Sequence, residues 1–445
     1  MSSTLDPMRS DIPFRPAAFP FYYGWVVLVV STIGLVMSAP GQTIGVAVFT
    51  EPLLEATGLS RSAFSNAYLV GTLASGLMLP WAGSVIDRVG VRAGVVWASI
   101  GLGTVVAYLS QVDRIAARIA SLGVSETITG YGMLTLGFVG LRFCGQGVLT
   151  LVCRTMLGRW FDRHRGLVSS IASPFASFAF AGSPVVLAAW VSESGWRGAW
   201  LEIAVVLGLG MPVLGWLFFR ESPEDCGLKI DGGPGPAKPA AVTAGDRARP
   251  DFTRVQALRT AAFWLVTLGV SSHAMVGTGI AFHIVDLGTE VGLSTADALG
   301  IFLPVTLISV PTGIVLGLAV DKFPMRFLIM GMMLGQVMMF GLAPHLGHPI
   351  LYWLCIAGWG LSGGFYGPLT VAALPNLFGR TYLGAISGVM MMVIVIASAL
   401  GPALLAAANA SFGAYGPALH GFALLPLGLC AIAPFARDRS FGTTG

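Results

Sequence analysis

The chain has 445 residues, of which 55% are hydrophobic and only 10% are charged. Soluble domains carry about 25% charged residues and need a polar surface, so a soluble enzyme, a secreted disulfide scaffold and a disordered chain are all excluded. The 25 basic and 21 acidic residues lie mainly in short stretches between long apolar ones. This distribution predicts a polytopic membrane protein and does not favour a nucleic-acid partner.

Uncharged stretches mark the expected membrane-spanning helices, because a helix needs about 20 mostly apolar residues to cross a bilayer. Two stretches are too long for one helix, and Gly- and Pro-containing sequences at 344–349 and 411–417 divide each of them in two. The fold class is therefore an all-α membrane protein with twelve helices. The predicted spans are 16–50, 62–86, 93–112, 127–153, 166–192, 198–219, 260–285, 298–320, two within 328–378 and two within 381–436.

The polar stretches between these helices predict the domain organisation. Residues 220–259 form the longest one, so we expect an N-terminal six-helix bundle (1–219), a cytoplasmic linker (220–259) with a surface helix near 251–259, and a C-terminal bundle (260–445). Apolar residues at helical spacing within 111–132 predict a short interfacial helix.

The basic residues predict the orientation, because they collect on the cytoplasmic side of short loops. If both termini are cytoplasmic, only four of the 25 basic residues fall in outer loops: Arg61, Arg114, Arg118 and Arg197. We expect an integral plasma-membrane protein, such as one of a bacterial inner membrane, with cytoplasmic N- and C-termini.

The two halves repeat a pattern after their second helix: a Gly, an acid four residues later, a base next to the acid, and an Arg five residues beyond the acid. The repeat predicts two pseudo-symmetric bundles. In the fifth and eleventh helices, Gly182-Ser183-Pro184 and Gly401-Pro402 are expected to act as interruptions. The repeated residues are Gly83, Asp87, Arg88 and Arg92 in the first half, and Gly317, Asp321, Lys322 and Arg326 in the second.

The first copy of this pattern, with Gly90 between Arg88 and Arg92, resembles the loop motif Gly-x-x-x-Asp-Arg-x-Gly-x-Arg of the major facilitator superfamily. The resemblance covers nearly the whole chain and implies two bundles that rock around a central site by alternating access. It implies that the motif and its second copy form a gate, in which Asp87 pairs with Arg88 or Arg92 and separates when the inner side opens. The alternative is that these charges only anchor the topology.

Further segments resemble the monocarboxylate and oxalate/formate branch of that superfamily. They include Tyr23-Gly24-Trp25, Arg142-Phe143-Cys144-Gly145-Gln146-Gly147 and Arg159-Trp160-Phe161. That branch often carries a Lys halfway along helix one, whereas this chain has Ser38-Ala39-Pro40-Gly41-Gln42-Thr43 there. The resemblance implies transport of an organic anion, usually by a monomer, but does not carry the substrate or the proton coupling across.

Arg142 is the only basic residue deep in a predicted helix, where a charge costs at least ~2.5 kcal/mol. Gln146 follows four residues later on the same helix face. Arg142 is predicted to bind a substrate carboxylate; the alternative is a structural role, bonding helix carbonyls or pairing with Glu202. Gln42 and Thr43 flank the Pro40-Gly41 break in helix one and are predicted to contact substrate.

The seventh predicted helix carries two histidines that are candidates for the site. His273 lies near mid-membrane and is predicted to contact substrate or carry a proton, with ordinary packing as the alternative. His283 and Asp286 share a face near the outer end and form a second candidate proton-carrying pair, with interfacial hydrogen bonding as the alternative. Tyr366, like Tyr68, is an aromatic that could close the cavity around a small substrate.

No ATP-binding loop, metal-ligand spacing or catalytic arrangement is present, so the sequence predicts no cofactor, no metal and no enzyme. The leading interpretation is a secondary transporter of a small organic anion, a mono- or dicarboxylate, working by proton symport or exchange. One alternative is efflux of drugs or lipophilic compounds, which the Gly-Pro sequences favour. Another is a membrane receptor that binds without transporting.

Overall fold

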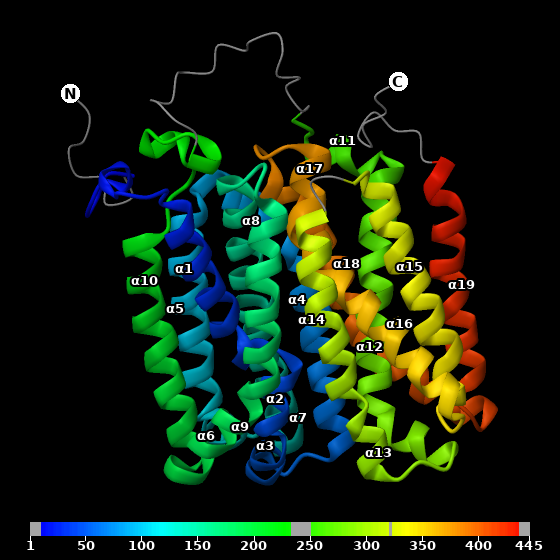
Figure 1. Ribbon diagram of the computed structural model, residues 1–445. Helices are drawn as coiled ribbons and strands as arrows, with labels where there is room; N and C mark the ends of the chain where they lie inside the picture. The colour runs from blue at the N-terminus through cyan, green and yellow to red at the C-terminus, as the bar shows by residue number, and fades with distance from the viewer. Residues whose placement is uncertain (1–9, 233–250, 320–322, 436–445) are drawn as a thin grey trace. The chain divides into compact units, whose positions relative to one another are not determined.

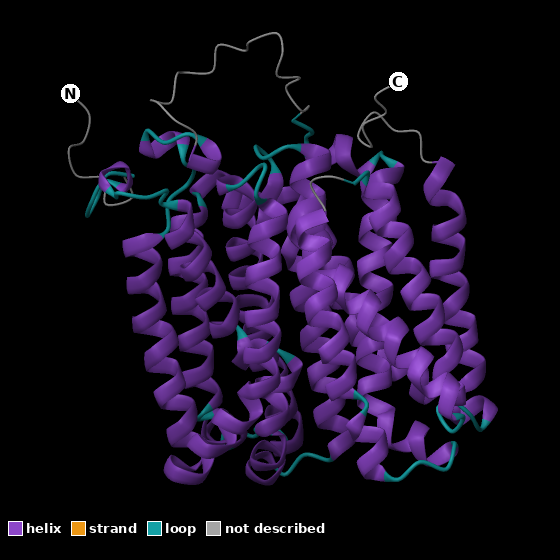
Figure 2. Cartoon of the chain, viewed as in Figure 1, coloured by secondary structure: helices purple, strands orange, loops and turns teal. Residues whose placement is uncertain are grey.

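The computed structural model describes residues 10–232, 251–319 and 323–435. Within these ranges the chain is helical with short connections and contains no strand (Figure 2), so the all-α prediction is confirmed. Contacts divide the chain into two compact units. Unit 1 comprises Met1–Asp162, Phe175–Asp246 and Ser387–Met392, and unit 2 comprises Arg163–Pro174, Arg247–Ile386 and Val393–Gly445. Of the second motif copy, Asp321 and Lys322 lie outside the described residues.

The first half of the chain contains ten α-helices among the described residues (Figure 1), with two π-type segments continuing helices across the span. The helices are α1 (Gly24–Met37), α2 (Thr43–Val48), α3 (Thr50–Thr57), α4 (Arg61–Val89), α5 (Val91–Leu109), α6 (Val112–Ala120), α7 (Glu126–Leu141), α8 (Thr150–Trp160), α9 (Arg165–Val205) and α10 (Met211–Phe218). Short segments are η1 (Pro16–Ala18), η2 (Ala39–Gly41), π-type η3 (Arg142–Leu149), π-type η4 (Val206–Gly210), η5 (Glu224–Cys226) and η6 (Ile230–Gly232).

The second half contains nine α-helices among the described residues. They are α11 (Arg254–Leu258), α12 (Ala261–Glu290), α13 (Thr295–Gly300), α14 (Phe302–Ala319), α15 (Met325–Leu342), α16 (Pro349–Pro368), α17 (Leu374–Phe378), α18 (Leu383–Phe412) and α19 (Gly416–Ile432), with η7 (Ala343–His345), π-type η8 (Leu369–Ala373) and η9 (Ala433–Phe435). Short helices occur in both segments where they were expected, as α6 within 111–132 and α11 within 251–259, and their placement at the membrane surface stays a prediction.

The twelve predicted spans all coincide with helical stretches of the described chain. Nine such stretches are long and apolar enough to cross a membrane. One of these, Arg165–Phe218, holds two predicted helices that separate at Gly195, whose positive φ of 67° breaks the helix. The remaining two spans are α16 and α19. Polar N-caps start several helices, as where Ser60 Oγ accepts from the amide of Ala63.

The expected interruptions at Gly182-Ser183-Pro184 and Gly401-Pro402 do not occur, because α9 and α18 continue through them. Membrane helices tolerate proline where neighbouring groups satisfy the backbone. In α18 the Gly401 position serves helix packing instead, since a Cβ there would collide with the Met275 carbonyl of α12.

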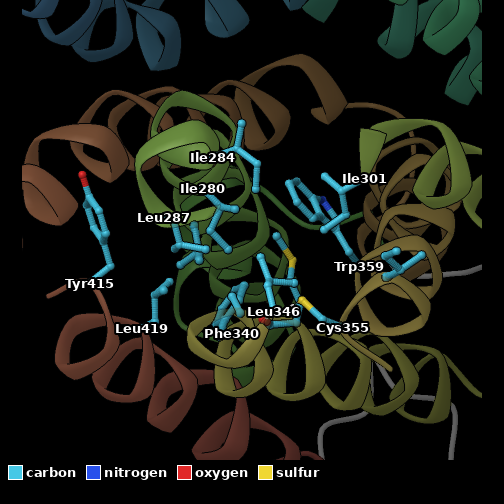
Figure 3. Packing of buried hydrophobic residues seen from close by; sticks show 14 of the residues in the cluster. Ile280, Ile284, Leu287, Ile301, Phe340, Leu346, Cys355, Trp359, Tyr415 and Leu419 are labelled. Atoms are coloured by element: carbon cyan, nitrogen blue, oxygen red, sulfur yellow. Dashed lines mark hydrogen bonds between the residues drawn. The ribbon is translucent and has the colours of Figure 1, made fainter. Parts of the chain in front are cut away.

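The core of unit 2 is an apolar cluster of helices α12, α15, α16 and α19 with their neighbours (Figure 3). Branched and aromatic side chains pack together there with almost no exposure. This packing fixes the positions of α12 and α16, the helices that carry His273 and Ser362. The labelled members are Ile280, Ile284, Leu287, Ile301, Phe340, Leu346, Cys355, Trp359, Tyr415 and Leu419.

In unit 1, the helices α1, α5, α8 and α10 lie side by side (Figure 1). The sequence around Pro40 interrupts the first span, which turns through η2 before α2. Here the backbone approaches η3 closely, since a Cβ on Gly41 would lie 2.7 Å from the Gly145 Cα atom. Only glycines at both positions permit this approach, and it brings the carbonyl group of Gly41 within reach of Arg142.

Candidate functional site

Arg142, at the first residue of η3, is only 2% exposed. Its Nη1 donates to the Gly41 carbonyl at 3.0 Å and to Thr43 Oγ1 at 3.4 Å. The guanidinium carbon lies 5.2 Å from the centre of the Tyr68 ring, and the Tyr68 hydroxyl donates to Thr43 Oγ1 at 2.9 Å. The helix-one break, α4 and η3 together therefore hold the guanidinium in one orientation.

The opposite edge of this guanidinium lacks hydrogen-bond partners within the described chain. Among the described residues, Nε and Nη2 of Arg142 have no hydrogen-bond acceptor, and no carboxylate lies within ion-pair distance. The alternative that Glu202 neutralises Arg142 is wrong, because Glu202 is exposed and accepts from Ser194 Oγ at 2.6 Å. The alternative that helix carbonyls satisfy Arg142 holds for one nitrogen only, because Nη1 donates to the carbonyl of Gly41.

The other predicted contacts in unit 1 gather at the same break. Gln146 lies on η3 with its Oε1 buried and without a donor among the described residues. Thr43 contacts Arg142 directly, whereas Gln42 donates through Nε2 to Ser38 Oγ at 3.1 Å. The part that Tyr68 plays beneath Arg142 was missed, since no local pattern links residues 74 positions apart.

In unit 2, the structure brings His273 and Tyr366 together. Nδ1 of His273 lies 2.7 Å from Ser362 Oγ, and its ring centre lies 5.4 Å from that of Tyr366. Helix α12 supplies the histidine and α16 the other two residues. Ser362 was not predicted, because its sequence surroundings contain only Gly and apolar residues.

The predicted pair His283 and Asp286 forms a loose contact of 3.9 Å between Nδ1 and Oδ2, and the Asp286 side chain is 71% exposed. His283 has nearer partners, with Nε2 at 3.0 Å from the Pro402 carbonyl and Nδ1 at 3.3 Å from the Tyr415 hydroxyl. The pair is thus part of a small polar cluster at the end of α12.

The pairing predicted inside the loop motif, of Asp87 with Arg88 or Arg92, stays a prediction, and the structure adds a partner from outside the motif. Asp87 makes its ion pair with Arg159 at 2.8 Å, and Arg88 is exposed. Arg92 donates to backbone carbonyls, from Nε to Trp216 at 2.8 Å and from Nη2 to Ile12 at 2.7 Å. The side chain of Arg92 points toward the segment before α1 and the end of α10, which no spacing rule within the motif could reveal.

Glu221, just after α10, completes this cluster and was missed by the sequence analysis. Its carboxylate accepts from the amides of Val91 and Arg92 at 2.8 and 3.0 Å and lies 3.3 Å from Arg159. The two amides are free donors at the N-terminus of α5, so the acid also meets the positive end of the helix dipole. Burial raises the pKa of Glu221, although these amides and Arg159 act in the opposite direction.

Two glycines of the motif have different roles. Gly90 has φ of 93°, and a Cβ there would collide with the Glu221 carboxylate. Gly83 is buried within α4.

In the second copy of the motif, the guanidinium carbon of Arg326 lies 5.1 Å from the centre of the Phe327 ring.

A cavity of ≈ 580 Å³ in unit 1 lies away from Arg142, beside the segment that precedes α1. Arginines and acids line it in equal number, so its charge does not select an ion of either sign. Its charged lining residues are Asp11, Arg15, Arg92, Arg220, Glu221 and Asp225.

Comparison with known proteins identifies the family. The sequence profile of the Major Facilitator Superfamily matches residues 23–402. No curated protein sequence matches the chain. Solved structures share the fold at low identity. A variant of the E. coli fucose:proton symporter FucP matches at 13% identity and TM-score 0.61, covering 94% of this chain and 99% of that chain.

The proton:xylose symporter XylE matches at 17% identity and TM-score 0.63, covering 92% of this chain and 95% of that chain. The human organic anion transporter MFSD10 (TETRAN) matches at 14% identity and TM-score 0.63, covering 92% and 99%. These structures support the fold and leave the substrate open. With a profile match over most of its length, this multi-pass membrane protein belongs to the Major Facilitator Superfamily, a family of transporters and not of enzymes.

Proposed function

We propose that this protein is a secondary transporter of a small organic anion, a mono- or dicarboxylate, which Arg142 binds during alternating access. The observation that carries the proposal is that the Nε and Nη2 groups of a buried guanidinium have no hydrogen-bond acceptor and no acid beside them among the described residues. Resemblance to the monocarboxylate and oxalate/formate branch points the same way.

A buried charge is stable only when it is paired or fully hydrogen-bonded. Arginine stays protonated in proteins, and Gly41, Thr43 and the Tyr68 ring satisfy one side of Arg142 only. A carboxylate fits the other side because its two oxygens accept the parallel Nε and Nη2 hydrogens as a bidentate pair. A neutral sugar offers no such compensation, so the site favours an anion over the substrates named for FucP and XylE.

Energy for transport would come from a proton gradient or from exchange of anions. For proton coupling, His273 beside Ser362 is the more buried candidate, and His283 with Asp286 is the more accessible one. The cluster of Asp87, Arg159 and Glu221 would act as the gate at the predicted cytoplasmic end, since alternating access requires charge pairs that form and separate.

Uptake of labelled carboxylates into proteoliposomes tests the proposal. Arg142→Gln should reduce uptake and carboxylate binding roughly 100-fold or more, because it removes one partner of a buried charge pair. Arg61→Gln is the matched control, since it removes an arginine that is 69% exposed and pairs with Glu51 at the surface.

Uptake that survives Arg142→Gln unchanged would contradict the assigned site. Tight binding of a carboxylate without flux across a sealed vesicle would instead favour a receptor.

A further inference from the structure

Gln146 carries the second buried polar atom at this site that lacks a partner. Its Oε1 receives no hydrogen bond from any described residue, although the atom is shielded from solvent. We propose that Gln146 determines specificity, and that the site selects carboxylates bearing a hydroxyl next to the carboxylate. This inference rests on the proposed function, because it requires Arg142 to hold the anion.

The positions of Arg142 and Gln146 on one helical segment support a shared ligand. Both belong to η3, whose wide π-type winding keeps side chains four residues apart on successive turns of one face. Residues at this spacing hold their Cβ atoms about 5–6 Å apart, a distance that a small hydroxy acid spans. π-type segments also occur frequently at functional sites.

The neighbouring hydroxyl groups already form hydrogen bonds within the chain. Thr150 Oγ1, one turn further along, lies 3.4 Å from both Ser38 Oγ and the Gly145 carbonyl. Thr43 Oγ1 receives the Tyr68 hydroxyl at 2.9 Å. The neighbouring hydroxyls of Thr43 and Thr150 therefore have partners within the chain, whereas Nε and Nη2 of Arg142 and Oε1 of Gln146 have none among the described residues.

The chemistry of the two atoms defines the ligand. Arg142 Nε is a donor and takes a carboxylate oxygen, whereas Gln146 Oε1 is an acceptor and needs a hydrogen. A bare carboxylic acid leaves that acceptor unsatisfied, and a 2-oxo acid brings a second acceptor against it. A 2-amino acid would donate, but its ammonium group would stand beside the guanidinium. A hydroxyl donates without adding charge, so 2-hydroxy acids should bind best, bare acids next and 2-oxo acids worst.

Binding of 2-hydroxybutyrate, butyrate and 2-oxobutyrate to the purified full-length protein tests this order, with affinities taken from ligand-dependent thermal shifts. A gained hydrogen bond should make 2-hydroxybutyrate bind about 5–10-fold more tightly than butyrate. Gln146→Leu keeps the approximate shape of the side chain and removes the acceptor, so the ratio of the two affinities should fall to about 1. Gln146→Asn shortens the side chain and should lose most of the preference as well.

Thr150→Val is the matched control on the same helix face and should leave the ratio unchanged, because its hydroxyl already has partners. Equal binding of butyrate and 2-hydroxybutyrate, or a preference that persists in both Gln146 variants, would overturn the role of Gln146 while leaving the anion site intact. Failure of all three acids to bind would overturn the anion site and this inference together.

Discussion

Arg142 and Arg220 are equally buried in unit 1 but differ in how they are satisfied. Arg220 is 1% exposed, and its nitrogens donate to carbonyls on both sides of it: Ser10, Ile12, Phe14, Leu217 and Phe219. Arg142 uses Nη1 alone. Among the described residues, the chain itself supplies acceptors for all the side-chain nitrogens of Arg220, but only for one nitrogen of Arg142.

Position in the helix explains this difference. Arg220 follows α10, where the last carbonyls of a helix have no intrahelical partner, and the segment before α1 supplies more. Arg142 lies inside a helical span, where the carbonyls are used by the helix itself. Only the break at Pro40-Gly41 frees one for it. Arg142 therefore keeps donors without a partner in the described chain, which another molecule could satisfy.

Replacing each arginine by methionine gives the largest expected contrast. Arg220→Met leaves several buried carbonyls without donors and should reduce the free energy of unfolding by about 3 kcal/mol. Arg142→Met removes an uncompensated buried charge and should leave stability unchanged or raise it. Thermal unfolding of both purified variants measures the difference. The comparison fails if Arg142→Met is the less stable of the two.

Arg142→Lys keeps the charge and removes the planar guanidinium group. Lysine presents a compact ammonium group that cannot make two parallel bonds to a carboxylate. We expect carboxylate affinity to fall about 10-fold or more while the unfolding temperature without ligand stays the same. Wild-type affinity in the lysine variant would show that charge alone, and not the paired geometry of Nε and Nη2, attracts the anion.

Arg159 shows a third way to satisfy an arginine, with two carboxylates. Glu221→Gln should destabilise unit 1 by about 1 kcal/mol, because it removes charge from the α5 N-terminus and from Arg159. Unit 2 has a comparable contact, where Asp251 accepts from the amide of Arg380 at 3.1 Å.

Asp251 is exposed, so Asp251→Asn should have a smaller effect than Glu221→Gln. Chemical unfolding of both variants measures the difference, with Glu55→Gln, an exposed acid at the far end of unit 1, as the control. Equal losses in the two variants would show that burial does not distinguish the two contacts.

The sequence predicted those features that depend on local patterns. Apolar length predicted helical stretches that the described chain contains, nine of them long and apolar enough to cross a membrane. Pro40-Gly41 predicted the break in the first span, and the isolation of Arg142 singled out the candidate site. Features that join distant residues were not predictable. Glu221 meets Arg159 across 62 positions of the chain. Gly401 meets the Met275 carbonyl of α12 across more than a hundred positions, in a helix that continues through Pro402.

Arg197 is intermediate between Arg220 and Arg142 in how many partners it has, and its ion pair gives the smallest expected effect on stability. Near α6, its Nη1 and Nη2 hold both carboxylate oxygens of Asp113 at 2.8 and 2.6 Å, and Nη1 also donates to the Ser110 carbonyl. Partial burial alone would raise the pKa of Asp113, but the hydrogen bonds and charge of Arg197 hold it below the ordinary value. Because the folded-state pKa is lowered, this pair stabilises the protein above the unfolded-state pKa of the acid, and the contribution disappears as the pH falls through the folded-state value.

Asp113→Asn should reduce the free energy of unfolding by about 1 kcal/mol or less at neutral pH and make unfolding less sensitive to acid. A pH series of unfolding temperatures checks this, and an identical acid dependence in the variant and the wild type would contradict it.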